Sequence, residues 1–155
     1  MIHRAGVILY RESSDEFLLV QSKYSLKWGF PKGMCEKHET IIDCAMRELK
    51  EETGCILDKT DRLITTIIIR DCEYFVVHTD RDICINKSEC DVNEINDIQW
   101  TKRNDIQFIS KNSGLTRYYK EFIQPTQPIQ PTQHSHLKRH PPVIDSDGFT
   151  VVSYK

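Results

Sequence analysis

The feature that most constrains the fold is the stretch WGFPKGMCEKHETIIDCAMRELKEETGC, residues 28–55, in which two local patterns meet. In its first part Pro31 lies between Gly29 and Gly33, and this punctuation predicts a loop. From Thr40 onward the apolar residues recur at the spacing of one helix face; they are Ile42, Ala45, Met46 and Leu49. The stretch is therefore expected to be a loop that leads into an amphipathic helix.

Both ends of this helix carry residues that commonly terminate one. Thr40 followed by Asp43 approximates a capping box, in which side chains bond to free amides of the first turn. Gly54 suits the C-cap because glycine adopts the left-handed conformation without steric cost. We therefore expect a helix over about residues 40–53.

Short apolar runs on either side of the helix predict strands. The runs AGVILY (5–10) and FLLV (17–20) are separated by the polar RESSDE, which predicts a β-hairpin. The β-rich runs RLITTIIIR (62–70) and EYFVVHT (73–79) predict a second hairpin. The chain is therefore expected to contain both strands and a helix.

The turn of the second hairpin is expected at Asp71 and Cys72, between its two strands. Three more elements follow: a weaker strand at 82–86, a strand at 95–102 and a terminal helix at 115–123.

The overall composition limits the kinds of partner. A chain of 155 residues is about one domain. The net charge of −2 gives no global basic field, so any polyanion must be held locally. The six cysteines include no C-x-x-C pair and follow no apolar signal segment, so we interpret them as reduced thiols in a cytosolic-type compartment. No apolar run approaches the roughly 18 residues of a membrane span, and we expect no membrane contact.

The composition changes at Gln124. The repeat QPTQPIQPTQ is rich in proline, which lacks the backbone donor that a helix or central strand requires. We therefore divide the chain into a domain at 1–124 and a Pro/Gln-rich linker with a flexible tail at 125–155. Three apolar residues near the end are candidate anchors for a protein partner: Phe149, Val151 and Val152.

Three glutamates of the predicted helix pose an electrostatic problem. Glu48, Glu51 and Glu52 project within an arc of about 100°, where like charges repel. A hard cation such as Mg²⁺ or Mn²⁺ would neutralise them, because it prefers oxygen ligands and bridges carboxylates to phosphates. Arg47, four residues before Glu51, is placed to orient that carboxylate. The alternative interpretation is a solvated, charged helix face.

The spacing of these residues resembles the signature of the Nudix hydrolases: Gly, any five, Glu, any seven, then Arg-Glu-aliphatic-any-Glu-Glu-any-Gly-aliphatic. The match begins at Gly33 and continues at those intervals with Glu39, Arg47, Glu48, Leu49, Glu51, Glu52 and Gly54. The only departure is Cys55 in the last aliphatic position, and cysteine is small and readily buried. The order of predicted elements over about residues 3–123 is similar to that of the family as well.

The resemblance implies a Nudix α/β/α sandwich with a mixed sheet and a loop-helix-loop metal site. It implies that Glu48, Glu51 and Glu52 bind Mg²⁺ or Mn²⁺, helped by a main-chain carbonyl near Lys32 and Gly33. The implied activity is hydrolysis of a nucleoside diphosphate linked to another group, by attack of water on phosphorus. The structural residues of the motif would be Gly33, Glu39, Arg47, Leu49 and Gly54.

Two kinds of carboxylate are candidates for the general base. In this family it is a glutamate of the motif or an acidic residue of a later loop, where the sequence offers Glu89, Asp91 and Glu94. We favour Glu94 as an additional ligand or base, with Glu52 as its competitor. The expected catalytic set is Glu51, Glu52, Glu94 and Arg47.

Two segments bear on the substrate. WGFPKG (28–33) is similar to the run before the motif in mRNA decapping enzymes, and NEINDIQW (93–100) resembles their later strand. Together these segments favour the 5′ cap of mRNA as the substrate. WxxPKG also occurs in dinucleoside polyphosphate hydrolases, which supply the alternative substrate.

The residues expected to contact a nucleotide or capped RNA are Trp28, Lys32, Lys37 and Tyr74. Trp28 is equally compatible with packing in the core. A third interpretation is a Nudix-fold binding module without catalysis, and the intact glutamates argue against it.

Overall fold

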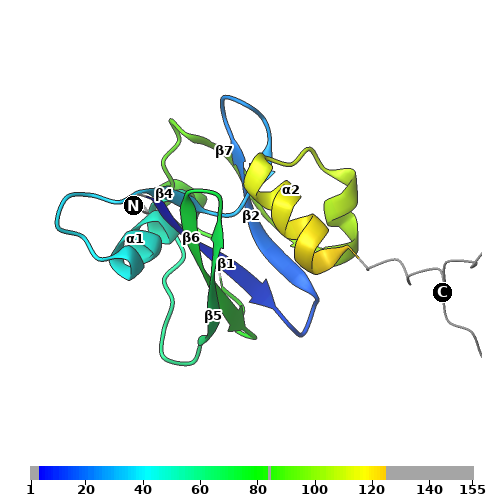
Figure 1. Ribbon diagram of the computed structural model, residues 1–155, viewed down its shortest axis with the longest axis horizontal. Helices are drawn as coiled ribbons and strands as arrows, with labels where there is room; N and C mark the ends of the chain where they lie inside the picture. Colours follow the sequence, from blue (N-terminus) through cyan, green and yellow to red (C-terminus); the bar gives the residue numbers. More distant parts are fainter. Residues whose placement is uncertain (1–3, 84, 125–155) are drawn as a thin grey trace, which may run out of the picture. The chain divides into compact units, whose positions relative to one another are not determined.

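The computed structural model describes residues 4–83 and 85–124, and within them a mixed β-sheet lies between helical layers (Figure 1). The strands are β1 (Arg4–Arg11), β2 (Glu16–Ser22), β3 (Trp28–Gly29), β4 (Lys32–Met34), β5 (Arg62–Ile69), β6 (Cys72–Thr79) and β7 (Ile95–Lys102). The sheet has the order β3-β2-β1-β6-β5, with β4 paired to β1 and β7 paired to β2. The predicted α/β/α sandwich with a mixed sheet is confirmed.

The helices are α1 (Ile41–Thr53) and α2 (Ser113–Tyr118), together with the helical turns η1 (Lys87–Glu89), η2 (Arg103–Phe108) and η3 (Tyr119–Ile123). Both predicted caps of α1 are confirmed. The Thr40 hydroxyl accepts a hydrogen bond from the Asp43 amide at 3.2 Å. Gly54 has a φ of 71°, and its amide donates to the Lys50 carbonyl at 2.8 Å. The free backbone groups at both ends of α1 are thus partly satisfied by its own sequence.

The terminal helix starts two residues before its predicted range of 115–123. The side-chain oxygen of Asn112 accepts a hydrogen bond from the Leu115 amide at 2.9 Å, and this cap sets the start at Ser113. Its last turn, η3, ends at Ile123 as predicted.

β1 is the central strand and is buried on both faces. It pairs in parallel with β6 along its whole length. One face shares a core with Ala45 and Leu49 of α1, and the other shares a core with Leu115 and Tyr118 of α2. A strand covered on both faces needs apolar residues at consecutive positions, which accounts for the unbroken run AGVILY.

The predicted hairpin of β1 and β2 is present, but the strands pair only beside its turn, at Tyr10–Phe17 and Arg11–Glu16. Farther along, β1 pairs with β4 and β2 pairs with β7. The segment predicted only as a loop therefore contains the short strands β3 and β4. The carbonyl of Pro31, just before β4, accepts a hydrogen bond from the Val7 amide at 3.0 Å, which joins this segment to β1.

The second predicted hairpin, β5 with β6, is also present. Its turn lies at Arg70 and Asp71, one residue before the predicted pair, and Arg70 has a φ of 60°. Cys72 belongs to β6 and is buried in the core on the α2 side. Burial of this thiol, which the sequence pattern did not reveal, explains the shift.

The strand predicted at 82–86 is wrong for the four of its residues that are described; the fifth, Cys84, lies outside the described residues. The Ile83 amide donates locally to the Arg81 carbonyl at 3.0 Å, and the Asn86 amide donates to the Thr53 carbonyl at 3.3 Å. The end of α1 therefore takes a hydrogen bond that a neighbouring strand would have taken. The strand predicted at 95–102 is confirmed as β7.

None of the helices in the described part of the chain is long and apolar enough to cross a membrane. The predicted linker and tail, 125–155, with the proposed anchors Phe149, Val151 and Val152, lie outside the described residues.

Candidate active site

One cavity of about 300 Å³ collects acidic side chains from two parts of the chain. They come from α1 and from the loop before β7, and they are Glu48, Glu51, Glu52, Asp91 and Glu94. Two cationic residues, Arg4 and Lys32, line the same cavity. The glutamates predicted from the helix and the later-loop candidate Glu94 therefore lie together.

Backbone hydrogen bonds hold the later loop beside α1. The Asp91 amide donates to the Glu51 carbonyl at 2.9 Å. The Lys23 amide donates to the Glu94 carbonyl at 2.8 Å. Both acidic residues of this loop are thus fixed at the cavity through the main chain, while their side chains remain exposed.

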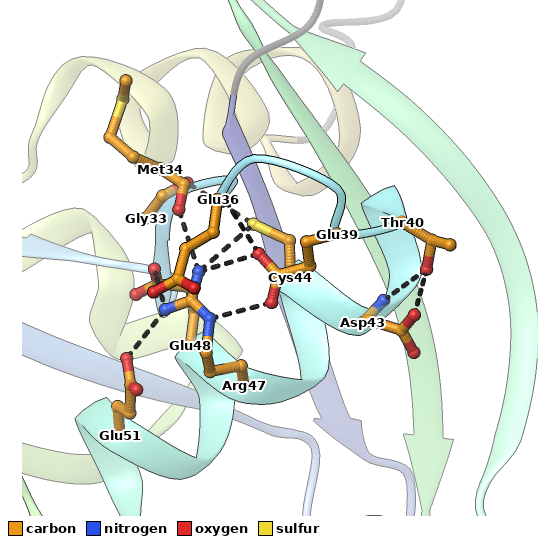
Figure 2. A network of polar contacts seen from close by, with 10 residues as sticks. All are labelled: Gly33, Met34, Glu36, Glu39, Thr40, Asp43, Cys44, Arg47, Glu48 and Glu51. Carbon is orange, nitrogen blue, oxygen red and sulfur yellow. Dashed lines mark hydrogen bonds and ion pairs between the residues drawn. The ribbon is translucent and has the colours of Figure 1, made fainter.

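Arg47 fastens the loop before α1 to the helix (Figure 2). Its Nε and Nη2 donate to the two carboxylate oxygens of Glu39 at 2.8 and 3.0 Å, and Nη2 also donates to the Met34 carbonyl at 2.9 Å. Its Nη1 donates to Glu48 at 2.8 Å and to Glu51 at 2.9 Å. Every donor group of the guanidinium therefore has an acceptor, and paired charges of this kind are strong hydrogen bonds.

The carboxylate of Glu39 completes this network from the loop. It accepts a further hydrogen bond from the Glu36 amide at 3.0 Å. The hydrogen bonds from Arg47 and from Glu36 lower the pKa of Glu39 to about 2. The motif glutamate outside the helix is thus a structural acid that fixes the loop.

Gly33 is needed because Glu48 lies directly over its α-carbon. A Cβ at this position would lie 2.1 Å from Cδ of Glu48 and 2.2 Å from each carboxylate oxygen. The glycine of the motif therefore leaves room for an acidic side chain, which explains why the spacing joins these two residue types.

Glu52 is half-buried, and its carboxyl group faces β4. Its Oε2 accepts a hydrogen bond from the Lys32 amide at 2.9 Å. Burial raises the pKa of Glu52 to about 8; the Lys32 amide opposes this rise, and the charges of Glu48 and Glu94 add to it. A cation placed at this carboxyl group would favour its ionised form.

The acidic residues fit a divalent ion in chemical type. All offer oxygen ligands, and burial raises the pKa of Glu48 as well as that of Glu52, so a cation would offset the cost of both charges. As they stand, no three of the described His, Cys, Asp and Glu side chains are grouped closely enough to hold an ion. In this arrangement one nitrogen of Arg47 binds both Glu48 and Glu51. Glu51, whose side chain is 53% exposed, lines the cavity together with Glu48.

A second cavity of about 280 Å³ adjoins the first and shares four lining residues with it: Arg4, Lys32, Glu52 and Glu94. Its other walls include Phe30, Tyr24 and Lys27. Phe30 is buried and Tyr24 is exposed, so the cavity offers aromatic surface beside the acidic residues. Such a pair of joined cavities suits a ligand with both a polyphosphate and a base.

The other residues predicted to contact substrate are more scattered. Lys32 lines both cavities. Trp28 is 9% exposed and packs in the core on the α2 side. Tyr74 is 1% exposed, stacks edge-on against Phe30, and lines a third cavity of about 270 Å³ with Arg4 and Lys32. Lys37 is exposed in the loop before α1 and lines none of the cavities described here.

Arg4 is the functional candidate that sequence reasoning missed. It begins β1 and lines all three of these cavities. A single arginine before an apolar run carries no motif, and only the pairing of β1 with β4 brings it to the site. Leu49 and Gly54, by contrast, hold the positions expected of them: Leu49 is buried in the core and Gly54 ends α1.

The chain is similar to proteins named for mRNA decapping. An m7GpppN-mRNA hydrolase of Saccharomyces cerevisiae is 33% identical over 122 residues, which cover 74% of this chain and 12% of the yeast protein. An mRNA-decapping protein of African swine fever virus is 30% identical over 117 residues, which cover 63% of this chain and 47% of the viral protein. The chain thus spans only a part of the length of these relatives.

The fold is similar to that of solved structures. A Caenorhabditis elegans Ap4A hydrolase in a binary complex superimposes with a TM-score of 0.55 at 24% identity, over 77% of this chain and 96% of that one. The NUDIX domain family matches residues 2–122. Because this match spans most of the chain and includes the motif helix, the chain belongs to the Nudix family.

Proposed function

We propose that this chain is a divalent-metal-dependent pyrophosphohydrolase that cleaves the 5′ cap of mRNA. The observation that carries the proposal is the cavity in which Glu48, Glu51 and Glu52 of α1 meet Asp91 and Glu94 of the later loop. A cluster of carboxylates with a glycine-lined loop beside it suits a cation that bridges protein and phosphate oxygens.

The three glutamates of α1 would hold Mg²⁺ or Mn²⁺, with a main-chain carbonyl near Lys32 and Gly33. When bound there, such an ion would supply charge to neutralise phosphate oxygens and would lower the pKa of a water for in-line attack on phosphorus. Arg47 keeps the helix and its preceding loop in register, so that the acidic side chains stay at the cavity.

Glu94 is the proposed general base, with Glu52 as its competitor. Glu94 lines both joined cavities, is exposed, and sits on a loop that backbone hydrogen bonds fix. A base must accept a proton from water, and an exposed carboxylate at the cavity is able to do so. Glu52 is half-buried against β4, which suits a metal ligand better.

A basic groove beside the site favours capped RNA over a small dinucleotide. This groove, about 480 Å³ in volume, is lined by five cationic residues: Lys27, Arg70, Lys111, Arg117 and Lys120. Its one acidic residue, Glu121, is paired with Arg117 at 2.7 Å. It shares Arg70 and Ser113 with the third cavity, which shares Arg4 and Lys32 with the acidic cavity. The short helix α2 by itself has few basic residues, but the fold places basic residues of other elements in the same groove. Contacts between such residues and phosphates strengthen RNA binding.

The test offers three substrates in parallel: cap-labelled RNA, free cap dinucleotide and diadenosine tetraphosphate, each with Mg²⁺ or Mn²⁺. Release of the labelled cap nucleotide from RNA supports decapping. If the RNA-linked cap is not cleaved while a free dinucleotide is, the decapping proposal fails.

The second candidate is hydrolysis of dinucleoside polyphosphates. The run WGFPKG and the similarity in fold to the Ap4A hydrolase favour it. The basic groove separates the two, because a dinucleotide would leave it unused. The double variant Arg70→Ala/Lys120→Ala should lower kcat/KM by about tenfold for capped RNA and by less for the dinucleotide. The kcat/KM of this variant for capped RNA should also depend less steeply on salt concentration than that of the wild type. Arg62→Ala, which removes an exposed arginine paired with Glu12, is the charge control.

A catalytically inactive binding module is the third candidate. It predicts cap or nucleotide binding without product, whereas the hydrolase proposal predicts metal-dependent turnover.

The proposed location is the cytoplasm, where capped mRNA is available, and fractionation of cells that produce the protein tests it. The proposed role of 125–155 is to bind a protein partner. Deleting 125–155 should leave hydrolysis of small substrates unchanged, and loss of folding of the shortened chain would contradict the proposed domain boundary.

A further inference from the structure

Arg4 lines the acidic cavity, whereas Arg47 binds two of the glutamates that line it, and the hydrogen bonds of the two arginines differ. Arg47 uses Nε, Nη1 and Nη2 on carboxylates and a carbonyl of the protein. It has no donor left for a ligand. Its position in the structure is that of a structural cross-link.

Arg4 is the opposite case. Its Nε is buried and has no hydrogen-bond partner among the described residues. Its closest charged neighbour there is Asp71, with 3.9 Å between Nη1 and Oδ2, and the Asp71 side chain is 70% exposed. The Arg4 side chain as a whole is nevertheless 38% exposed, so its guanidinium is open to the cavity, and an anion bound there would supply acceptors that the described residues do not.

The backbone places Arg4 firmly. As the first residue of β1 it pairs with Met34 of β4 on one side and with Cys72 of β6 on the other. β4 also carries Lys32, which lines the same three cavities of about 300, 280 and 270 Å³. The guanidinium of Arg4 and the ammonium of Lys32 therefore stand at the junction of the acidic cavity with its neighbours.

The charges define what such a junction would bind. On the α1 side the cavity presents carboxylates that favour a cation, and its lining cations are Arg4 and Lys32. A diphosphate bridged to a divalent ion still has oxygens with negative charge that the ion does not cover. A guanidinium fork matches two oxygens of one phosphate, and a lysine ammonium adds a point charge.

We propose that Arg4, together with Lys32, binds a phosphate group of the substrate at the junction of these cavities. The inference rests on the proposed function, since it assigns the phosphate subsite of the same active site. Arg4 is then a substrate-binding residue, while Arg47 is a structural one.

The test measures binding directly with methylene diphosphonate, a diphosphate analogue whose P–C–P link is not hydrolysed. Isothermal titration calorimetry at saturating Mg²⁺ compares the wild type with Arg4→Ala, Arg4→Lys and the control Arg62→Ala. We expect Arg4→Ala to weaken binding by about 30-fold and Arg4→Lys by about fivefold, because lysine keeps the charge without the fork. Arg62→Ala should change binding less than twofold.

Two further measurements separate the outcomes. Mg²⁺ affinity without the analogue should change less than threefold in Arg4→Ala, and thermal unfolding reports whether the variant folds. If Arg4→Ala does not fold, Arg4→Lys decides alone. Binding within twofold of the control in the folded variant overturns the proposal, as does a wild type that does not bind the analogue; in the latter case Arg4 serves only Asp71.

Failure of the proposed function has a different signature. A wild type that cleaves none of the three substrates, yet binds the diphosphonate through Arg4, would overturn the hydrolase proposal and leave the phosphate subsite in place.

Discussion

The two sides of the acidic cavity differ in how their charged side chains are paired. On the α1 side, Arg47 joins Glu39, Glu48 and Glu51 in one network in which each group of the guanidinium has an acceptor. On the β1 side, Arg4 has a buried nitrogen without a partner among the described residues, and Lys32 has a side chain that lines three cavities.

This difference distinguishes an arginine that stabilises the fold from an arginine that can bind a ligand. Arg4 lines the cavity and Arg47 binds glutamates that line it, so residue type alone would not distinguish them. The Arg47 guanidinium holds the loop and the helix together, because all of its donors bond to acceptors of the protein. The Arg4 guanidinium is available to a ligand, because its side chain is 38% exposed at the cavity and its Nε has no hydrogen-bond partner among the described residues.

The largest expected effect comes from the half-buried acid of the α1 side. Glu52→Gln removes the charge that a metal ligand needs while nearly keeping the shape, so kcat should fall by on the order of 10³-fold. Steady-state hydrolysis at saturating Mg²⁺ measures this. Glu36→Gln, an exposed acid of the loop before α1, is the control and should stay within twofold of wild type.

A retained kcat in Glu52→Gln would remove this glutamate from the site and leave the loop acids as the catalytic group. In that case Glu94→Gln becomes the deciding variant.

The next largest effect is expected from a variant that breaks the Arg47 network. Arg47→Met leaves Glu39 and Glu48 partly buried without their cation, and we expect the free energy of unfolding to fall by about 2–3 kcal/mol. Urea denaturation followed by fluorescence measures it. Arg117→Met removes an exposed helix pair with Glu121 and should cost about 0.5 kcal/mol or less. Equal losses in both variants would mean that the Arg47 network has no special weight.

A smaller effect is expected in the pH dependence of the free energy of unfolding. The pKa of Glu39 is about 2 in the folded protein against an ordinary value of 4.5, so its ionised form stabilises the fold. This contribution is complete above about pH 4.5 and is lost as the pH falls toward 2. Urea denaturation of the wild type and Glu39→Gln across this range measures it: their difference in unfolding free energy should shrink with falling pH. A constant difference would show that Glu39 is not paired as described.

The smallest effect is expected from a lysine that the sequence grouped with the site. Lys37 is exposed and lines none of the cavities at the site, so Lys37→Ala should change kcat/KM less than twofold. Lys32→Ala should lower kcat/KM by about tenfold, because Lys32 lines the joined cavities. A larger loss at Lys37 than at Lys32 would place the phosphate on the α1 side instead.

The parts of the fold that local patterns control were predicted well. The caps of α1, Thr40 and Gly54, act within a few residues of the helix and appear as predicted. The apolar run of β1 was recognised because burial on both faces imposes it on the sequence. The motif spacing placed Glu48, Glu51 and Glu52 on one helix face, and all three line one cavity.

The errors lie where long-range pairing competes with local pattern. The segment DICIN at 82–86 was predicted to be a weaker strand, but the Asn86 amide bonds to the end of α1 instead. The loop before α1 contains β3 and β4 because β1 and β2 offer free edges there. Trp28 packs in the core on the α2 side, which is one of the two interpretations that the sequence allowed, and Tyr74 is buried there as well.

The sequence by itself determined the motif helix, its caps and the acidic face that suits a divalent ion, because these depend on residues a few positions apart. It also determined the family, through a spacing that extends from Gly33 to Gly54. Only the tertiary structure decided which charges are satisfied and which are available. Arg4, Lys32 and Glu94 are far apart along the chain, and the pairing of β1 with β4 and the docking of the later loop on α1 bring them to one cavity.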